Sequence, residues 1–380
     1  MQVLLWILGV LVLVRLALPI VALAFINRAL KKNENFKGQV RRINLNLIGG
    51  IIYLKEIQGS MVDKESGIDS LKLTIDKVEI GIKVSELLRR IINANVIIHH
   101  PNVVYAKVIS KEEPKERENS NVELSRLQTS PLKTALENVM PFAIKLTILN
   151  GRVRFIDHTS DAKIDVQAEG LHVKVINFSN IPANASVPAK INAIANVYQG
   201  KWNFTMDLKP LEQYLTFGLK LSLKEASMPL LNNFFHSFGK IDVNEGSLSL
   251  FMELAAENGV FKGYVKPIFK NLEIIGVEDK NDSFFIRIWE RLVATVVRTL
   301  QNNKLDQIAT IVPVEGRFDH PQVNVLAAIA GVLKNAFIEG LRPSFENAIG
   351  FRSVVKSAFS DPSGFIIKCI RLINGIKSYR

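Results

Sequence analysis

The sequence predicts a mainly β fold: an N-terminal transmembrane helix, then a curled, incompletely closed antiparallel β-sheet, with amphipathic helices near the C-terminus. Three observations support this prediction. Residues 3–26 are almost uninterrupted apolar sequence, many short segments after residue 40 alternate apolar and polar side chains, and a helical apolar period appears only after residue 283. With 380 residues, 48% of them hydrophobic, the chain can bury a sizeable core.

The first element is the apolar segment at residues 3–26. At about 1.5 Å per residue, a helix of this length crosses a hydrocarbon layer roughly 30 Å thick. Ala22-Leu23-Ala24 resembles a signal-peptide cleavage site, but no basic residue precedes the segment, and its apolar run is longer than that of a usual signal peptide. We therefore expect residues 1–30 to form a retained anchor with a basic juxtamembrane end. Arg15 lies inside this segment, and we expect it to snorkel or to pair with an acidic group of a partner subunit.

The net charge of +12 is concentrated at the two ends of the chain. Residues 1–42 carry +6 and residues 351–380 carry +5, so the middle is almost neutral. A nucleic-acid partner would require basic residues on the folded body, and we expect none. Basic clusters beside a membrane anchor attract anionic lipid headgroups instead. We expect the following side chains at a membrane surface: Arg28, Lys31, Lys32, Lys368, Arg371 and Lys377.

The body alternates apolar and polar residues with a period of two. Segments such as Leu71-Lys72-Leu73-Thr74-Ile75 and Phe217-Gly218-Leu219-Lys220-Leu221 place their apolar side chains on one face, which predicts half-buried antiparallel strands. Three dipeptides typical of hairpin turns separate strand-like residues: Asn150-Gly151, Gln199-Gly200 and Asn258-Gly259. We expect a first β unit at residues 31–109 and a larger sheet at residues 141–282.

A weak internal repeat favours a groove-like sheet built from repeated units. An apolar alternation runs into a glycine and then resumes near Gly49, Gly151 and Gly246, at intervals of roughly a hundred residues. Ordinary hairpins that end in glycine explain the same pattern almost as well. Between the two β regions, residues 110–140 begin with a charged stretch that lacks apolar side chains. We expect a linker or a long loop there, with a short helix.

Helical periodicity returns late in the chain. Apolar positions recur every three or four residues at 284–300 and again at 325–339, before Pro343. We expect helix, strand and helix within residues 283–345, packed on the sheet or capping its open end. Residues 346–380 form a basic amphipathic segment, which suits either a lipid interface or docking on the body.

Catalytic and metal-ligating patterns are absent from the sequence. The histidines show no metalloprotease spacing, and the single cysteine, Cys369, allows neither an internal disulfide nor a thiolate metal cluster. Asp157-His158 and Asp319-His320 are adjacent pairs, but neighbours on a strand point to opposite faces. We expect no enzyme, no metal and no cofactor, and a hydrolase that uses these two pairs is the least favoured alternative.

Several short stretches resemble one family. They are Leu18-Pro19, Asn27-Arg28-Ala29-Leu30, Gly38-Gln39-Val40, Val84-Ser85-Glu86-Leu87-Leu88, His100-Pro101-Asn102-Val103, Asn150-Gly151-Arg152-Val153-Arg154-Phe155, Asn244-Glu245-Gly246-Ser247-Leu248, Gly263-Tyr264-Val265-Lys266-Pro267-Ile268-Phe269-Lys270-Asn271-Leu272 and Ile311-Val312-Pro313-Val314-Glu315-Gly316-Arg317-Phe318. As a set they resemble the AsmA-like proteins of Gram-negative envelopes, close to the domain-of-unknown-function branch of the AsmA and TamB superfamily. The resemblance implies a single-pass anchor in the inner membrane, a periplasmic body and a long curled sheet with an apolar concave face that shelters lipid.

The periplasmic placement conflicts with the charge distribution. Basic residues follow the anchor and none precedes it, so the positive-inside rule would leave the body in the cytoplasm. We follow the resemblance, because a folded β domain can be translocated despite flanking charge. The chain is also short for the family, which puts autonomous bridging between two membranes in doubt.

Alternation and the resemblance together nominate residues of the inner face. They are Leu146, Ile148, Phe155, Val166, Val173, Phe204, Leu219, Leu221, Leu250 and Tyr264. An acyl chain gains roughly 0.8 kcal/mol for each methylene that such a face buries. We expect a non-enzymatic protein that binds or helps transfer phospholipid or another envelope lipid and contributes to outer-membrane biogenesis. The alternative is a scaffold for other envelope proteins, with Arg15 and residues 110–121 as protein contacts.

Overall fold

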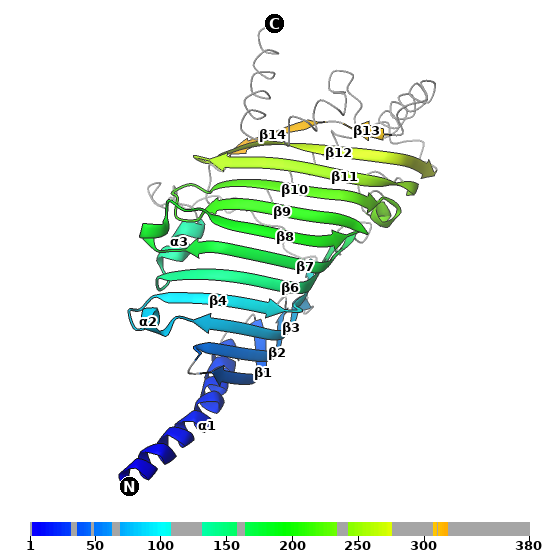
Figure 1. Ribbon diagram of the computed structural model, residues 1–380. Coiled ribbons are helices and arrows are strands. Elements are labelled where there is room, and N and C mark those ends of the chain that lie inside the picture. Colours follow the sequence, from blue (N-terminus) through cyan, green and yellow to red (C-terminus); the bar gives the residue numbers. More distant parts are fainter. Residues whose placement is uncertain are drawn as a thin grey trace, which may run out of the picture.

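The computed structural model describes residues 2–31, 36–46, 49–62, 69–107, 131–157, 164–233, 242–275, 307–309 and 311–317. Within these residues, fourteen strands form one curled sheet (Figure 1). The first and last strands of the sheet do not pair with each other in the described part of the chain, so the predicted mainly β, incompletely closed sheet is confirmed. The charged stretch at 110–121, the helices predicted at 284–300 and 325–339, and the basic segment at 346–380 lie outside the described residues.

The spatial order of the strands follows their order in the sequence almost throughout. They are β1 (Phe36–Asn46), β2 (Ile51–Val62), β3 (Asp69–Ile82), β4 (Ile92–His99), β5 (Asn102–Lys107), β6 (Phe142–Asp157), β7 (Ile164–Ser179), β8 (Ala189–Val197), β9 (Gly200–Lys209), β10 (Thr216–Ser227), β11 (Asp242–Glu257), β12 (Val260–Ile275), β13 (Gln307–Ala309) and β14 (Val312–Arg317). Short helices α2 (Val84–Leu87), α3 (Pro131–Glu137), η2 (Pro182–Asn184) and η3 (Pro229–Leu231) lie between strands. Most strands pair with the next strand along the chain in a hairpin, because two antiparallel strands need only a short connection.

One seam of the sheet is parallel, which the sequence did not predict. β4 and β5 follow each other along the same line between β3 and β6, and both run parallel to β6. A parallel pair needs a long crossover, and residues 108–141 provide one. The strands expected as two separate units therefore belong to one continuous sheet.

Helix α1 (Gln2–Lys31) joins the sheet at β1 and extends away from it (Figure 1). The Asn27 side-chain amide donates to the Val40 carbonyl (2.9 Å), and the Asn27 side-chain oxygen accepts from the Val40 N–H (2.7 Å). These two hydrogen bonds take the place of those that a neighbouring strand would make with the outer edge of β1. The apolar segment at 3–26 falls within α1, but the side chains of residues 2–5 and 7–14 lie outside the description. Among the described residues, no helix has the length and apolarity needed to cross a membrane.

A line of backbone irregularities crosses the strands and creases the sheet. Glu56 of β2, His100 after β4, Asn150 of β6 and Gly170 of β7 all have left-handed backbone conformations. The β6–β7 and β7–β8 registers shift beside Asn150 and Gly170. Such bulges bend a strand and increase its twist. In Figure 1 the first strands bend behind the sheet, toward the side on which α3 lies.

The bulges also correct two sequence predictions. Asn150-Gly151 was predicted to be a turn, but it lies inside β6, because the left-handed conformation of a tight turn also suits a bulge. Asn258-Gly259 forms the predicted turn, and a turn also occurs at Gln199, but its central residues are Tyr198 and Gln199, because Gly200 already begins β9. The glycines of the suspected repeat are not equivalent either: Gly50 lies in a turn, whereas Gly151 and Gly246 lie within β6 and β11.

Candidate functional site

One row of directly paired residues is apolar on every strand that it crosses. The row contains one residue from each of twelve strands, namely Ile43, Leu54, Val78, Ile98, Ile148, Val173, Ala193, Phe204, Leu221, Met252, Val265 and Val312. With neighbouring strands about 4.8 Å apart, the row is about 53 Å long. We call the side of the sheet that carries it the apolar face.

The next row along the strands lies on the opposite side of the sheet and is mainly polar. It contains Asn44, Tyr53, Glu79, Ile97, Thr147, Lys174, Asn192, Thr205, Lys220, Glu253, Tyr264 and Pro313. Neighbours in a strand point to opposite faces, so these two rows define an apolar and a polar face of one sheet. An amphipathic sheet of this kind must cover its apolar face.

Nine of the ten nominated inner-face residues lie on the apolar face. Their cross-strand partners place Leu146, Ile148, Phe155, Val166, Val173, Phe204, Leu219, Leu221 and Leu250 there. Tyr264 does not belong with them, because it pairs with Glu253 and Pro313 on the polar face. Its neighbour Gly263 lies on the apolar face, where it pairs with Leu254 of β11.

The apolar face is not equally accessible along its length. From β2 to β7 most of its side chains are half-buried, including Leu54, Ile80, Ile98, Ile148 and Val173, with Val78, Ala94 and Phe142 as buried exceptions. We call this part the open section. On β12 the apolar-face side chains Phe261, Val265, Pro267 and Phe269 are at most 2% exposed. We call the apolar-face residues of β11, β12 and β14 the closed end.

Helix α3 lies on the apolar face. Leu132 of α3 packs against the buried cluster that includes Ala189, Leu208 and Phe217. Asn180 fixes the end of α3 to the sheet, because its side chain donates to the Leu136 carbonyl (2.9 Å) and accepts from the backbone N–H of Phe142 (2.6 Å). The crossover between the parallel strands thus covers part of this face.

The polar face is crossed by ion pairs. Arg154 donates twice to the Asp165 carboxylate, at 2.8 and 2.5 Å, and this carboxylate raises the pKa of Arg154. The hydroxyl of Tyr198 donates to the Asp165 carbonyl at 3.3 Å, and burial, with the charge of Asp165, raises the pKa of Tyr198 to about 12. Glu79 accepts from Lys77 (2.7 Å) and contacts His99 (2.8 Å), and the Lys77 hydrogen bond holds the pKa of Glu79 below its ordinary value. The Arg154–Asp165 and His99–Glu79 contacts join neighbouring strands on the polar face, whereas the Lys77–Glu79 pair lies within β3.

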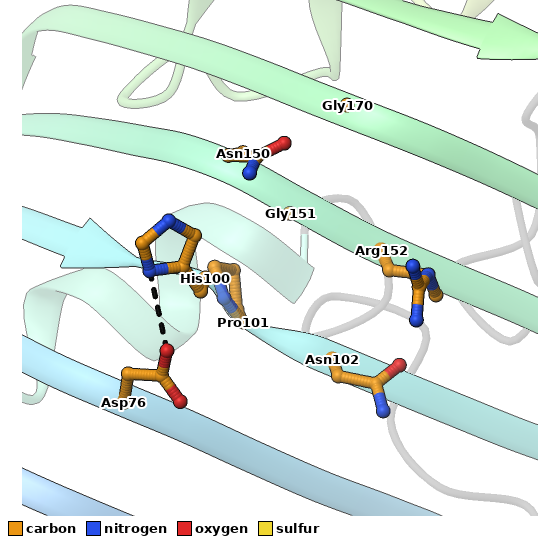
Figure 2. Close-up of a pocket in the computed structure, with 8 residues that line it drawn as sticks. All are labelled: Asp76, His100, Pro101, Asn102, Asn150, Gly151, Arg152 and Gly170. Atoms are coloured by element: carbon orange, nitrogen blue, oxygen red, sulfur yellow. Dashed lines mark ion pairs between the residues drawn. The ribbon is translucent and has the colours of Figure 1, made fainter.

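The crease carries a polar cleft of about 310 Å³ (Figure 2). Its lining comes from β3, the β4–β5 junction, β6 and β7: Asp76, His100, Pro101, Asn102, Asn150, Gly151, Arg152 and Gly170. His100 Nδ1 lies 3.2 Å from Asp76 Oδ2, and Arg152 pairs with Glu169 at 3.6 Å. Both members of each pair are more than half exposed, so solvent screens them. The cleft can hydrogen-bond a small polar group, and no serine, threonine, cysteine or lysine is among its lining residues.

The sequence patterns alone do not identify this cleft as a site. Its signals were present in His100-Pro101 and Asn150-Gly151, which were interpreted only as turn-like or family-like residues. Bulges on adjacent strands bring these residues together, and a one-dimensional pattern does not reveal which bulges lie side by side.

The remaining nominated residues divide between described and undescribed parts of the chain. Arg28 and Lys31 lie exposed in the last turn of α1. Lys32, Lys368, Arg371 and Lys377 lie outside the described residues, as do His158, Asp319 and His320. Asp157 lies at the end of β6. Within the described part of the chain, no three His, Cys, Asp or Glu side chains gather as metal ligands.

No family model matches the chain, and no curated protein matches it significantly.

Proposed function

We propose that this protein is a non-enzymatic, membrane-anchored lipid-binding protein of the cell envelope that holds acyl chains against the apolar face of its sheet. The observation that carries the proposal is the apolar row, which is unbroken over twelve strands. The ligand is a phospholipid or another envelope lipid. This assignment fits the sequence resemblance to AsmA-like proteins.

The energetics favour an acyl chain as the occupant of the open section. Half-buried side chains such as Ile80, Ile98 and Ile148 leave apolar surface in contact with water unless a ligand covers it. Ten methylenes buried there contribute roughly 8 kcal/mol before the entropy losses of binding. A polar ligand would gain nothing from these side chains, because they offer no hydrogen-bonding groups.

The anchor and the location are proposed from the sequence. Residues 3–26 are apolar, and Arg28 and Lys31 follow them, an arrangement suited to a helix that ends at a charged lipid surface. We place the anchor in the inner membrane and the sheet in the periplasm of a Gram-negative bacterium, in line with the resemblance. A reporter fused after Arg380 tests this orientation, and reporter activity that requires the cytoplasm would overturn it.

The test measures lipid bound to the full-length protein. The chain is purified in mild detergent, and co-purifying lipid is extracted and quantified by mass spectrometry. Ile148→Asp places a charge on the apolar face, and Thr147→Asp places the same charge on the polar face one residue away. We expect lipid with the wild type and Thr147→Asp, and its loss in Ile148→Asp.

Circular dichroism of the three proteins verifies that the sheet is folded in each. A folded wild type without lipid, or equal lipid in both variants, would contradict the proposal. Crosslinking in membranes separates the scaffold alternative, which predicts discrete protein adducts and no lipid adducts on the apolar face.

A further inference from the structure

We infer that the apolar face forms a trough that is closed at the end made by β11, β12 and β14, so that lipid enters and leaves at the end next to α1 and does not pass β12. The inference rests on the proposed function, since it specifies where on the apolar face the lipid is held. A trough open at both ends would conduct lipid along its length. A trough with one open end makes the protein a holder that loads and releases its lipid at the same place.

The apolar side chains of the closed end are almost fully buried. Met252, Leu254 and Ala256 of β11 and Val312 and Val314 of β14 are at most 5% exposed, and they belong to one buried cluster with Phe261 and Val265. An acyl chain in this region would have to displace packed side chains, at a cost comparable to overpacking a core.

The glycines of the closed end show how tightly it is packed. A Cβ added to Gly316 of β14 would lie 2.2 Å from the Phe261 ring, and one added to Gly263 of β12 would lie 1.9 Å from the Glu253 carbonyl oxygen. The ring of Phe261 therefore covers the bare backbone at Gly316. Even a single methyl group has no room at these positions.

The open section contrasts with this packing. On β6, the apolar-face residues Ile144, Leu146 and Ile148 are all half-buried. On β3, Ile80 and Ile82 of the same face are half-buried as well. These strands lie between β1 and the middle of the sheet, on the side of α1. Half-buried apolar side chains continue on β9 and β10, as at Phe204 and Leu221, so the surface available to an acyl chain ends before β12.

The α1 end has the chemistry of an entrance for a phospholipid. Large apolar side chains of α1 are exposed, with Ile20 at 71% and Phe25 at 73%, and Asn27 holds the helix on the edge of β1. Arg28 and Lys31 lie exposed in the last turn of α1, where cations attract the phosphate of a headgroup. Apolar surface therefore leads from the helix to the open section, with basic groups at the junction.

Site-specific photocrosslinking in the full chain tests this inference. An aliphatic diazirine amino acid replaces one residue at a time: Ile80 or Ile148 in the open section, and Met252 or Val265 at the closed end. Thr147 and Lys220 on the polar face serve as matched controls. After irradiation of membranes, the protein is digested and lipid adducts are quantified by mass spectrometry.

We expect lipid adducts at Ile80 and Ile148 and only the background of the polar-face controls at Met252 and Val265. Equal adduct yields at the closed end and in the open section would overturn the inference and leave the proposed function standing. Background yields at all four apolar positions in a folded protein would refute the proposed function itself, and the inference with it.

Discussion

The packing of Phe261 on Gly316 allows a double-mutant cycle at the closed end. Phe261 is 1% exposed, so Phe261→Ala leaves a cavity and should lower the free energy of unfolding by about 3–5 kcal/mol. Gly316→Ala inserts a methyl group 2.2 Å from the ring, and because the ring is enclosed we expect a loss of about 1–3 kcal/mol.

The two substitutions should not be additive. In the Phe261→Ala background the new methyl group enters the vacated space, so Gly316→Ala should leave the free energy of unfolding almost unchanged or raise it. The expected coupling energy is about 0.5–3 kcal/mol. Urea unfolding of the full chain, followed by circular dichroism, measures all four corners of the cycle.

Lys262→Ala provides the control, because Lys262 lies next to Phe261 but on the exposed polar face. We expect its effect to stay within about 0.5 kcal/mol. Additivity of Phe261→Ala and Gly316→Ala within about 0.5 kcal/mol would refute the reasoning, since it would mean that the ring does not cover Gly316.

Three further predictions follow from the hydrogen bonds and ion pairs. Asn27→Leu removes both side-chain hydrogen bonds to Val40, so the free energy of unfolding should fall by roughly 1–3 kcal/mol and amide hydrogen exchange at Val40 should accelerate. The lowered pKa of Glu79 adds stability above its unfolded pKa, and this stability is lost as the pH falls through the folded pKa; Glu79→Gln should flatten the acid limb of a denaturation profile. The phenol of Tyr198 should ionise near pH 12 in an ultraviolet titration, and stability should fall as the pH rises from 10 through 12, less steeply in Tyr198→Phe.

Alternation predicted the faces of the sheet because each strand places successive side chains on opposite sides. Leu146, Ile148 and Val173 were assignable in this way without knowledge of the strand order. Tyr264 was wrong because the inward position beside it is Gly263, which hides the alternation of Phe261 and Val265. A glycine contributes no apolar side chain to a pattern, although its backbone still lies on the apolar face.

The crease was not predictable, because a bulge restarts the alternation. Ile148 and Val153 both lie on the apolar face although they are five positions apart, an odd offset that would place them on opposite faces of a regular strand. On the sequence alone they appear to belong to two strands joined by a turn at Asn150-Gly151. The sequence also does not reveal that β6 pairs in parallel with β4 and β5, because this depends on which edge of the earlier strands β6 joins after the crossover.

Burial along the apolar face also depends on tertiary packing. Ile148 and Val265 have the same apolar character and occupy the same row, yet one is half-buried and the other is 1% exposed. Alternation indicates the direction of a side chain and not the depth of what covers it. For that reason the sequence nominated a single groove and did not distinguish an open section from a closed end.

The most direct test of the central claim is a density map of the full chain purified in discs of native membrane. Our account predicts elongated lipid density along the apolar face of β2 to β7, in contact with Ile148, and none beyond Val265. An apolar face covered throughout by the protein's own side chains, with no lipid density on the open section, would contradict it.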